Sequence, residues 1–225
     1  MGEFPLNNPY YDAAIAENAV LRERLRRLLE DNARQERRIA ELGHMATVDA
    51  VTGVLNSNTI RGLLRDKIER YNGTPFALFV GDVDRFKDVN DTLGHDRGDE
   101  LLNLIGSYLD DHLRQSDVSG VVGRPGGDEF WIIADLIPRA DRFEGDRMTP
   151  EERCKKLHMK LDSGLKAVIA EFRKSQNPGE LVLPEGVGTL SIGYAIYVPG
   201  ESVKDFTSRV DKNMYTEKRS RVDEK

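Results

Sequence analysis

The sequence predicts an α/β domain, with a sheet covered by helices, that follows a long coiled-coil helix. Short apolar runs bounded by Gly, Pro and Asp alternate with longer stretches whose apolar residues recur at helical spacing. The first part of the chain instead repeats its apolar residues in heptads. These two observations divide the chain into a dimerisation helix over residues 1–45 and an α/β domain over residues 46–225.

The composition is that of a globular protein: 225 residues, 39% hydrophobic and 32% charged, with a net charge of −6. The acidic balance argues against a nucleic-acid partner but allows a nucleotide substrate, because a divalent cation can supply positive charge. The single cysteine, Cys154, excludes an intrachain disulfide and a thiolate metal cluster. The sequence has neither a signal peptide nor an apolar stretch of the roughly 20 residues that cross a bilayer, which predicts a cytoplasmic chain without a membrane segment.

A heptad pattern runs from Ala14 to Ala46, and Arg and Glu fill the flanking positions. Asn18 and Asn32 fall at a positions, where a buried Asn pairs best with its own copy in a parallel two-stranded coil. The pattern therefore predicts a homodimer through a parallel coiled coil; the alternative is an amphipathic helix packed on its own domain. The heptad positions are Ala14, Asn18, Leu21, Leu25, Leu28, Asn32, Gln35, Ile39, Leu42 and Ala46.

Gly43-His44-Met45 follows this helix and resembles a cloning junction. Residues 1–42 are then either a coil fused to force dimerisation or a truncated signalling helix. The sequence leaves both interpretations open.

Three elements are expected in the first half of the α/β domain. Residues 58–71 permit a helix, and Asn72-Gly73 marks a turn after it. The apolar run in residues 75–84 suits a buried strand. Residues 98–113 predict a helix, because their apolar residues recur at helical spacing. These are Leu101, Leu102, Ile105, Leu109 and Leu113.

The second half predicts three further strands and two helices. Residues 118–136 contain two short apolar strands around a Pro-Gly-Gly turn. Residues 149–174 predict a long helix with Thr149 as its N-cap and two glutamates in its first turn. A strand over residues 188–197 and a helix over residues 203–220 complete the domain.

Two clusters of acidic residues lie at strand ends: Asp82-Val83-Asp84, and Gly126-Gly127-Asp128-Glu129. Carboxylates at the tips of two strands of one sheet can converge on a hard cation, which prefers oxygen ligands. Adjacent glycines let a phosphate or a base approach the backbone closely. Taken alone, each cluster also has a structural explanation, either as surface acids at a strand end or as a glycine hairpin turn.

Together these residues resemble the GGDEF diguanylate cyclase family. The resemblance extends in order over residues 46–222. It rests on Gly-Gly-Asp-Glu-Phe at 126–130, on DAVTGVLN at 49–56, on DVDRFKDVNDTLGHDRGD at 82–99, on LSIG at 190–193 and on DKNMYTEK at 211–218. It implies a palm-like fold, related to nucleotide cyclases and polymerases, with a mostly antiparallel sheet flanked by helices.

The resemblance also implies a metal site. Asp82 and Asp128 would ligate Mg²⁺ (or Mn²⁺), with the Val83 carbonyl as a backbone ligand. Glu129 would be a further ligand or would help to deprotonate the attacking ribose 3′-hydroxyl. Asp128 and Glu129 are thus the implied catalytic residues.

The implied substrate is GTP. Asn90 and Asp99 would bind the guanine edge, His95 would lie against the nucleotide, and Lys87 and Lys218 would meet phosphate charge. Gly126 and Gly127 would let the nucleotide approach the turn. Two domains, each with one GTP, would face each other in the homodimer and make cyclic di-GMP and two pyrophosphates, which is bacterial second-messenger chemistry.

Two other functions fit the same residues. One is a catalytically silent module that binds GTP or cyclic di-GMP as a signalling receptor, although such a module has no need of all three acids. The other is a cyclase that accepts ATP. Asp99 argues against it, because adenine offers an acceptor at N1 where guanine offers a donor.

The chain departs from the family pattern at several places. Arg114 and Asp117 match an R-x-x-D inhibitory site for the product, but eight residues rather than five separate Asp117 from Gly126, so a surface salt bridge is the alternative. Ser57 replaces an arginine of the opening turn. Val222 stands where a phosphate-binding arginine is usual, and Arg219 or Arg221 are the candidates to replace it.

Overall fold

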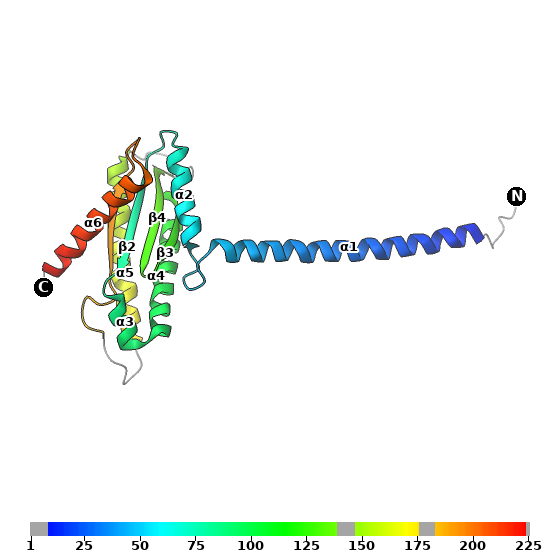
Figure 1. Ribbon diagram of the computed structural model, residues 1–225, viewed down its shortest axis with the longest axis horizontal. Coiled ribbons are helices and arrows are strands. Elements are labelled where there is room, and N and C mark those ends of the chain that lie inside the picture. The colour runs from blue at the N-terminus through cyan, green and yellow to red at the C-terminus, as the bar shows by residue number, and fades with distance from the viewer. Residues whose placement is uncertain (1–8, 139–146, 176–182, 224–225) are drawn as a thin grey trace. The chain divides into compact units, whose positions relative to one another are not determined.

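The computed structural model describes residues 9–138, 147–175 and 183–223. It divides into two compact units, Met1–Ala46 and Thr47–Lys225, which are described separately (Figure 1). Within the described residues, no helix is both long and apolar enough to span a membrane.

The described residues of the first unit lie in α1, an uninterrupted helix of 39 residues over Pro9–Thr47. Its heptad leucines are exposed in the single chain: Leu21, Leu25 and Leu28 are 54%, 58% and 58% exposed. Neighbouring charges pair along the helix surface, with Arg26 bonded to both Glu23 and Glu30. An apolar stripe flanked by ion pairs is the surface that a two-stranded coil buries. The side chains of Ile39 and Leu42 lie outside the described set.

The second unit is built on a five-stranded sheet in the order β1-β3-β4-β2-β5. β1 pairs with β3 in parallel, and every other pairing is antiparallel, as expected of the mostly antiparallel sheet. Strand β4 is therefore central, and β2 lies between β4 and the edge strand β5. The strands are β1 (Leu55–Asn56), β2 (Phe76–Val83), β3 (Val118–Gly126), β4 (Glu129–Pro138) and β5 (Leu190–Ile196).

Helices cover both faces of the sheet (Figure 1). Alternate residues of β2 point to opposite sides, so Phe79 belongs to one core cluster and Val80 to the other. Helices α4 (His95–Gln115) and α5 (Pro150–Lys174) contribute to the cluster of Phe79. Helices α2 (Ser57–Glu69) and α6 (Val203–Asp223) contribute to that of Val80.

Two short elements were not expected from the sequence. The two-residue strand β1 is too short to show a periodicity. Helix α3 (Phe86–Leu93) lies within the acidic motif and ends at Gly94, whose φ of 85° is in the left-handed region. The glycine breaks the helical path between α3 and α4, so that α4 begins at His95, before the expected residue 98.

Helix α5 begins as predicted, with Thr149 as its N-cap. The Thr149 hydroxyl accepts from the backbone N–H of Glu152 at 3.2 Å, and the Glu152 carboxylate accepts from that of Thr149 at 2.8 Å. Cys154 of this helix is buried in the hydrophobic core, where burial raises the pKa of its thiol to about 12. This cysteine therefore acts as a small apolar core residue.

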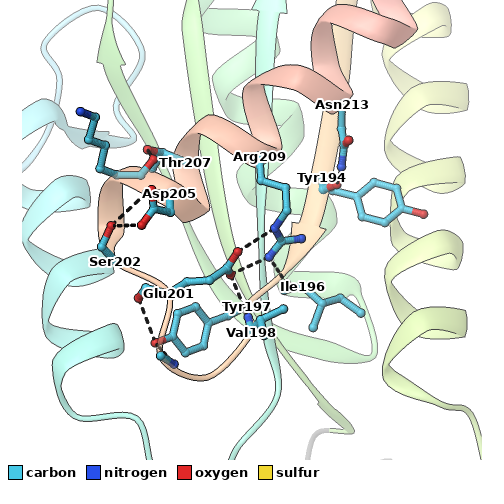
Figure 2. A network of polar contacts seen from close by, with 12 residues as sticks. Tyr194, Ile196, Tyr197, Val198, Glu201, Ser202, Asp205, Thr207, Arg209 and Asn213 are labelled. Atoms are coloured by element: carbon cyan, nitrogen blue, oxygen red, sulfur yellow. Dashed lines mark hydrogen bonds and ion pairs between the residues drawn. The ribbon is translucent and has the colours of Figure 1, made fainter.

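Polar contacts fasten the start of α6 to the end of β5 (Figure 2). Arg209 donates to the backbone carbonyl of Ile196 at 2.7 Å and to both carboxylate oxygens of Glu201 at 2.8 and 2.7 Å. One turn further along the helix, Asn213 donates to the carbonyl of Tyr194 at 2.8 Å. These bonds fix the path of α6 toward Lys218.

Candidate active site

The two acidic clusters meet at one end of the sheet. In the β2–β4 ladder Asp82 lies directly opposite Glu129, and Val83 donates its backbone N–H to the Asp128 carbonyl at 3.1 Å. Directly opposite residues of an antiparallel pair share a face of the sheet. The structure thus brings together Asp82, Asp128 and Glu129, as the sequence predicted for the strand tips.

The glycine turn between β3 and β4 is held in place by Arg124, a residue that the sequence analysis missed. Gly127 has a φ of 54°, which favours glycine. Arg124 donates to the Gly127 carbonyl at 2.8 and 2.6 Å and to Asp49 at 3.0 Å. Burial alone would raise the pKa of Asp49, but hydrogen bonds from Thr52 and Arg124 lower it. This ion pair therefore ties the opening motif to the turn.

Asp84 has a structural role at the edge of the site. It is buried, and its carboxylate accepts from the hydroxyls of Thr189 at 2.7 Å and Ser191 at 2.9 and 3.0 Å. Its backbone also bonds Gly188 and Thr189. Asp84 thus anchors the segment that leads into β5, which explains why only the first acid of the Asp-Val-Asp run lies beside Glu129.

Lys218 of α6 reaches this end of the sheet from far along the sequence. Its ammonium group binds the Asp82 carboxylate and lies 3.4 Å from the Asp84 carboxylate. Burial alone would lower the pKa of Lys218, but the hydrogen bond with Asp82 and the charges of both acids raise it. The predicted phosphate-binding lysine is therefore a charged group at the predicted metal ligand.

Burial and the charges of nearby acids raise the pKa of two carboxylates of the site, Asp128 and Glu129. The pKa of Asp128 is raised by burial and by the charge of Asp82. That of Glu129 is raised by burial and by the charges of Asp211 and Asp82, against a hydrogen bond from Trp131 and the charge of Arg61. Half-buried oxygens with this mutual repulsion have the donor chemistry that suits a hard divalent cation.

As these side chains stand, they do not converge on a metal position. Among the described residues, no three acidic, His or Cys side chains form a group that could hold a metal ion. Asp82 is engaged by Lys218, and Glu129 by Trp131. The donor set fits Mg²⁺ in chemistry. Binding the ion requires that Asp82 turn from Lys218, whereas the Trp131 bond engages only Oε1 of Glu129 and does not involve Oε2.

The predicted guanine-binding residues gather around α3 and the start of α4. Asn90 is half-buried, and a Cβ added to Gly98 would lie 1.9 Å from its Oδ1 atom. The predicted contacts His95 and Asp99 are exposed in the first turns of α4. Lys87 is exposed in the first turn of α3. The structure thus places all four within one helix–turn–helix that directly follows Asp84.

The R-x-x-D residues each have an ion-pair partner on a helix. Arg114 binds Asp110 one turn earlier in α4 at 2.7 Å, and Asp117 binds Lys156 of α5. The three additional residues that follow Asp117 lie within β3, whose pairing with β4 shifts register twice, between Val118 and Gly120 and between Gly123 and Gly126. These irregularities absorb extra length in a strand.

Of the two arginines that are candidates for the phosphate-binding position, the structure describes the side chain of Arg219. Arg219 stacks on Tyr215, its guanidinium carbon 4.6 Å from the ring centroid, and donates to the Tyr215 hydroxyl at 3.2 Å. The side chains of Arg221 and Val222 lie outside the described set. Ser57, at the departure in the opening motif, accepts from Arg61 at 3.3 Å.

Trp131 is a second residue at the site that the sequence analysis missed. Its indole N–H donates to Oε1 of Glu129 at 2.6 Å, and the guanidinium of Arg61 lies 4.7 Å from its ring centroid. The available signal was the strand period, since residues 129 and 131 of one strand point to the same face. That signal is weak, because it equally suits a tryptophan that serves only the core.

Comparison with known proteins gives consistent matches. The family model described as "Diguanylate cyclase, GGDEF domain" matches residues 46–224. Diguanylate cyclase DosC of Escherichia coli is 30% identical over 178 residues, covering 78% of this chain and 34% of DosC. Cyclic di-GMP phosphodiesterase NbdA of Pseudomonas aeruginosa is 38% identical over 119 residues, 49% of this chain and 15% of NbdA. The chain therefore spans about a third or less of these two relatives.

Solved structures agree with the fold. The crystal structure of diguanylate cyclase SiaD from Pseudomonas aeruginosa, in complex with its activator SiaC, matches with a TM-score of 0.60 at 27% identity, covering 94% of this chain and 77% of SiaD. The coiled coil and GGDEF domain of DgcB from Caulobacter crescentus matches with a TM-score of 0.61 at 24% identity, covering 93% and 95%. The second match extends the likeness of fold to a chain that has an N-terminal coiled coil.

Proposed function

Because this chain belongs to the GGDEF-domain diguanylate cyclase family, we propose that it is itself a diguanylate cyclase, which condenses two GTP into cyclic di-GMP and two pyrophosphates. The observation that carries the proposal is the register of Asp82 opposite Glu129, with Asp128 bonded to the strand of Asp82. A site that had lost catalysis would have no need to keep three acids together on two neighbouring strands.

The carboxylates of Asp82, Asp128 and Glu129, with the Val83 carbonyl, would hold Mg²⁺ (or Mn²⁺). The bound ion would neutralise charge on the triphosphate and on the leaving pyrophosphate. Lys218 supports the same task, because its ammonium group already lies at this end of the sheet. Glu129 is suited to accept the proton of the 3′-hydroxyl, since a carboxylate with a raised pKa binds a proton more readily.

Substrate recognition is assigned to α3, α4 and the glycine turn. Asn90 and Asp99 would bind the guanine edge, with His95 against the nucleotide and Lys87 near phosphate charge. The turn at Gly126 and Gly127 is exposed, and beyond the adjacent residues of the chain no atom lies within 4 Å of the position of a Cβ at either glycine. A phosphate can therefore approach this backbone closely.

The proposed active unit is a homodimer joined through the parallel coil of α1. Each domain would hold one GTP, so that each 3′-oxygen attacks the α-phosphorus of the nucleotide on the other domain. A tether of this kind raises the effective concentration of one half-site for the other, to the order of millimolar for short linkers. R-x-x-D residues Arg114 and Asp117 remain candidates for product inhibition.

The test is to incubate the purified chain with GTP and Mg²⁺ and to separate the nucleotides by chromatography. We expect cyclic di-GMP and pyrophosphate from the wild type, and a loss of at least about 100-fold in Asp128→Asn, since charge stabilisation of the transition state is removed. Light scattering confirms that both proteins are dimers. Absence of product from a verified wild-type dimer would overturn the proposal in favour of a module that binds GTP or cyclic di-GMP without turnover.

A further inference from the structure

Trp131 is the only tryptophan of the chain, and it lies outside the acidic motif. Its side chain is 4% exposed and belongs to the core cluster between the sheet and helices α2 and α6. In the sheet it lies between Val80 of β2 and Gly123 of β3. Ile60 of α2 packs over Gly123, where an added Cβ would lie 2.5 Å from the Cβ of Ile60. The ring is therefore held by packing on the same face of the sheet as Glu129.

The indole N–H is directed at Glu129 Oε1 at 2.6 Å, which is a short bond for an N–H donor. A buried tryptophan usually finds a partner for its N–H, but here the partner is the acid to which we assign a catalytic role. Arg61 covers the ring, with its guanidinium carbon 4.7 Å from the centroid. Arg61 of α2 therefore contacts the Trp131 ring, and the Trp131 ring in turn binds Glu129 at the end of β4.

Two nearby acids repel the charge of Glu129, against the attraction of Arg61. Asp82 lies opposite on β2, and Asp211 on α6 also acts on Glu129. Without a donor, the Glu129 side chain would turn away from these carboxylates toward solvent. The indole N–H of Trp131 is a neutral donor fixed by the core, and it holds Oε1 of Glu129 in place against this repulsion.

We propose that Trp131 is a positioning residue for Glu129: its indole N–H holds one carboxylate oxygen, so that the other is presented at the strand tip beside Asp82. Arg61 supports the orientation of the ring. The inference rests on the proposed function in one respect, the catalytic role of Glu129. A tryptophan that only filled the core would be replaceable by any ring of similar shape.

The decisive variant keeps the ring and removes the donor. Because the chain contains one tryptophan, growth on β-(3-benzothienyl)alanine replaces it at a single position by an isosteric ring with sulfur in place of N–H. Trp131→Phe is the genetic counterpart. Tyr197→Phe is the matched control, since Tyr197 lies in the same core cluster and its hydroxyl donates to the Glu201 carbonyl at 3.3 Å, away from the acids.

We expect kcat to fall roughly tenfold in both Trp131 replacements with little change in KM for GTP, because a hydrogen bond to a charged group is lost. Mn²⁺ binding in the presence of α,β-methylene GTP, followed by electron paramagnetic resonance, should weaken about three- to tenfold. Tyr197→Phe should change neither quantity. Thermal unfolding verifies that all the proteins are folded.

The two readouts separate this inference from the proposed function. If the wild type turns over GTP and the benzothienyl protein matches it in kcat and in Mn²⁺ affinity, the ring acts by shape alone and the inference is wrong. If the wild type makes no cyclic di-GMP, the proposed function fails, and the Mn²⁺ titration decides the inference by itself. Equal Mn²⁺ affinity of the two proteins would then overturn it.

Discussion

At the scale of single residues, the candidate site depends on side chains whose partners come from other elements. Lys218 of α6 faces Asp82 of β2, and Arg124 of β3 joins the glycine turn to Asp49. Each of these contacts neutralises a partly buried carboxylate that would otherwise be costly to hold in the folded chain. The role of a single site residue is therefore best tested by a substitution that displaces that residue and leaves the other contacts of the site in place.

Gly98→Ala tests the placement of Asn90. An added Cβ would lie 1.9 Å from Asn90 Oδ1, so the amide must rotate away. We expect KM for GTP to rise about tenfold, the effect of one lost hydrogen bond in a site built for it. Steady-state kinetics measures this change.

Gly62→Ala is the matched control, because it also lies in a helix and nothing is within 4 Å of its added Cβ. It should stabilise the domain by about 0.5–1 kcal/mol and leave KM unchanged. An unaltered KM in Gly98→Ala would show that Asn90 does not contact the substrate.

At the scale of elements, α6 is held at several points along its length. The Arg209 contacts fasten its start (Figure 2), and His158 of α5 binds it further along. His158 Nε2 lies 2.9 Å from the Ile192 carbonyl and 3.1 Å from the Glu217 carboxylate. Since Glu217 precedes Lys218, this pair joins α5, β5 and α6 beside the lysine of the site.

The His158–Glu217 pair predicts a pH dependence of stability. Burial alone would lower the pKa of His158, but the hydrogen bonds with Glu217 and Ile192 raise it above its usual value of 6.5. A raised pKa in the folded chain means that the stabilisation is fully present below pH 6.5 and is lost as the pH rises through the folded value. Urea unfolding of the wild type should therefore show a midpoint that decreases over that interval relative to His158→Gln.

Glu217→Gln removes the partner charge and serves as the second arm of this experiment. It should weaken the pH-dependent difference, because the remaining amide does not favour the imidazolium as a carboxylate does. Identical pH profiles of the wild type and His158→Gln would contradict the assignment of this pair.

Prediction from the sequence succeeded where a residue type and a period act together. The strands that end beside Asp82 and begin at Glu129, and the Thr149 cap, were all found in this way. Helix α3 and strand β1 were missed, because eight and two residues give little periodicity. Arg124 was missed for another reason: its partner Asp49 lies 75 residues away, and no local pattern encodes that contact. Trp131 was missed because the strand period that places it beside Glu129 equally suits a tryptophan of the core. The antiparallel order of the sheet likewise came from family resemblance alone.

At the scale of the whole molecule, activity is expected to depend on the coil. Replacing Leu21 and Leu28 by Glu places like charges in the predicted seam, so the chain should become monomeric. Its specific activity should then rise with protein concentration, whereas that of the wild type should stay constant over the same range. Light scattering and initial rates at several concentrations measure both quantities.

Two outcomes would contradict this prediction. If Leu21→Glu/Leu28→Glu remains a dimer, the seam does not run through these positions. If it is monomeric and retains a concentration-independent rate, a coil-held pair of half-sites is not required. The variant changes only exposed positions of α1, so the stability of the second unit serves as its control.

The contact between Lys218 and Asp82 spans 136 residues of sequence. During synthesis, the ribosome adds about 5–20 residues per second, so on the order of ten seconds pass between the emergence of the acid and that of its counter-charge. Throughout that interval the acidic strand tip lacks the cation that α6 supplies. The nascent sheet must therefore either assemble late or bind a cation from solution. The yield of folded domain should then depend on the concentration of divalent salt in the translation mixture.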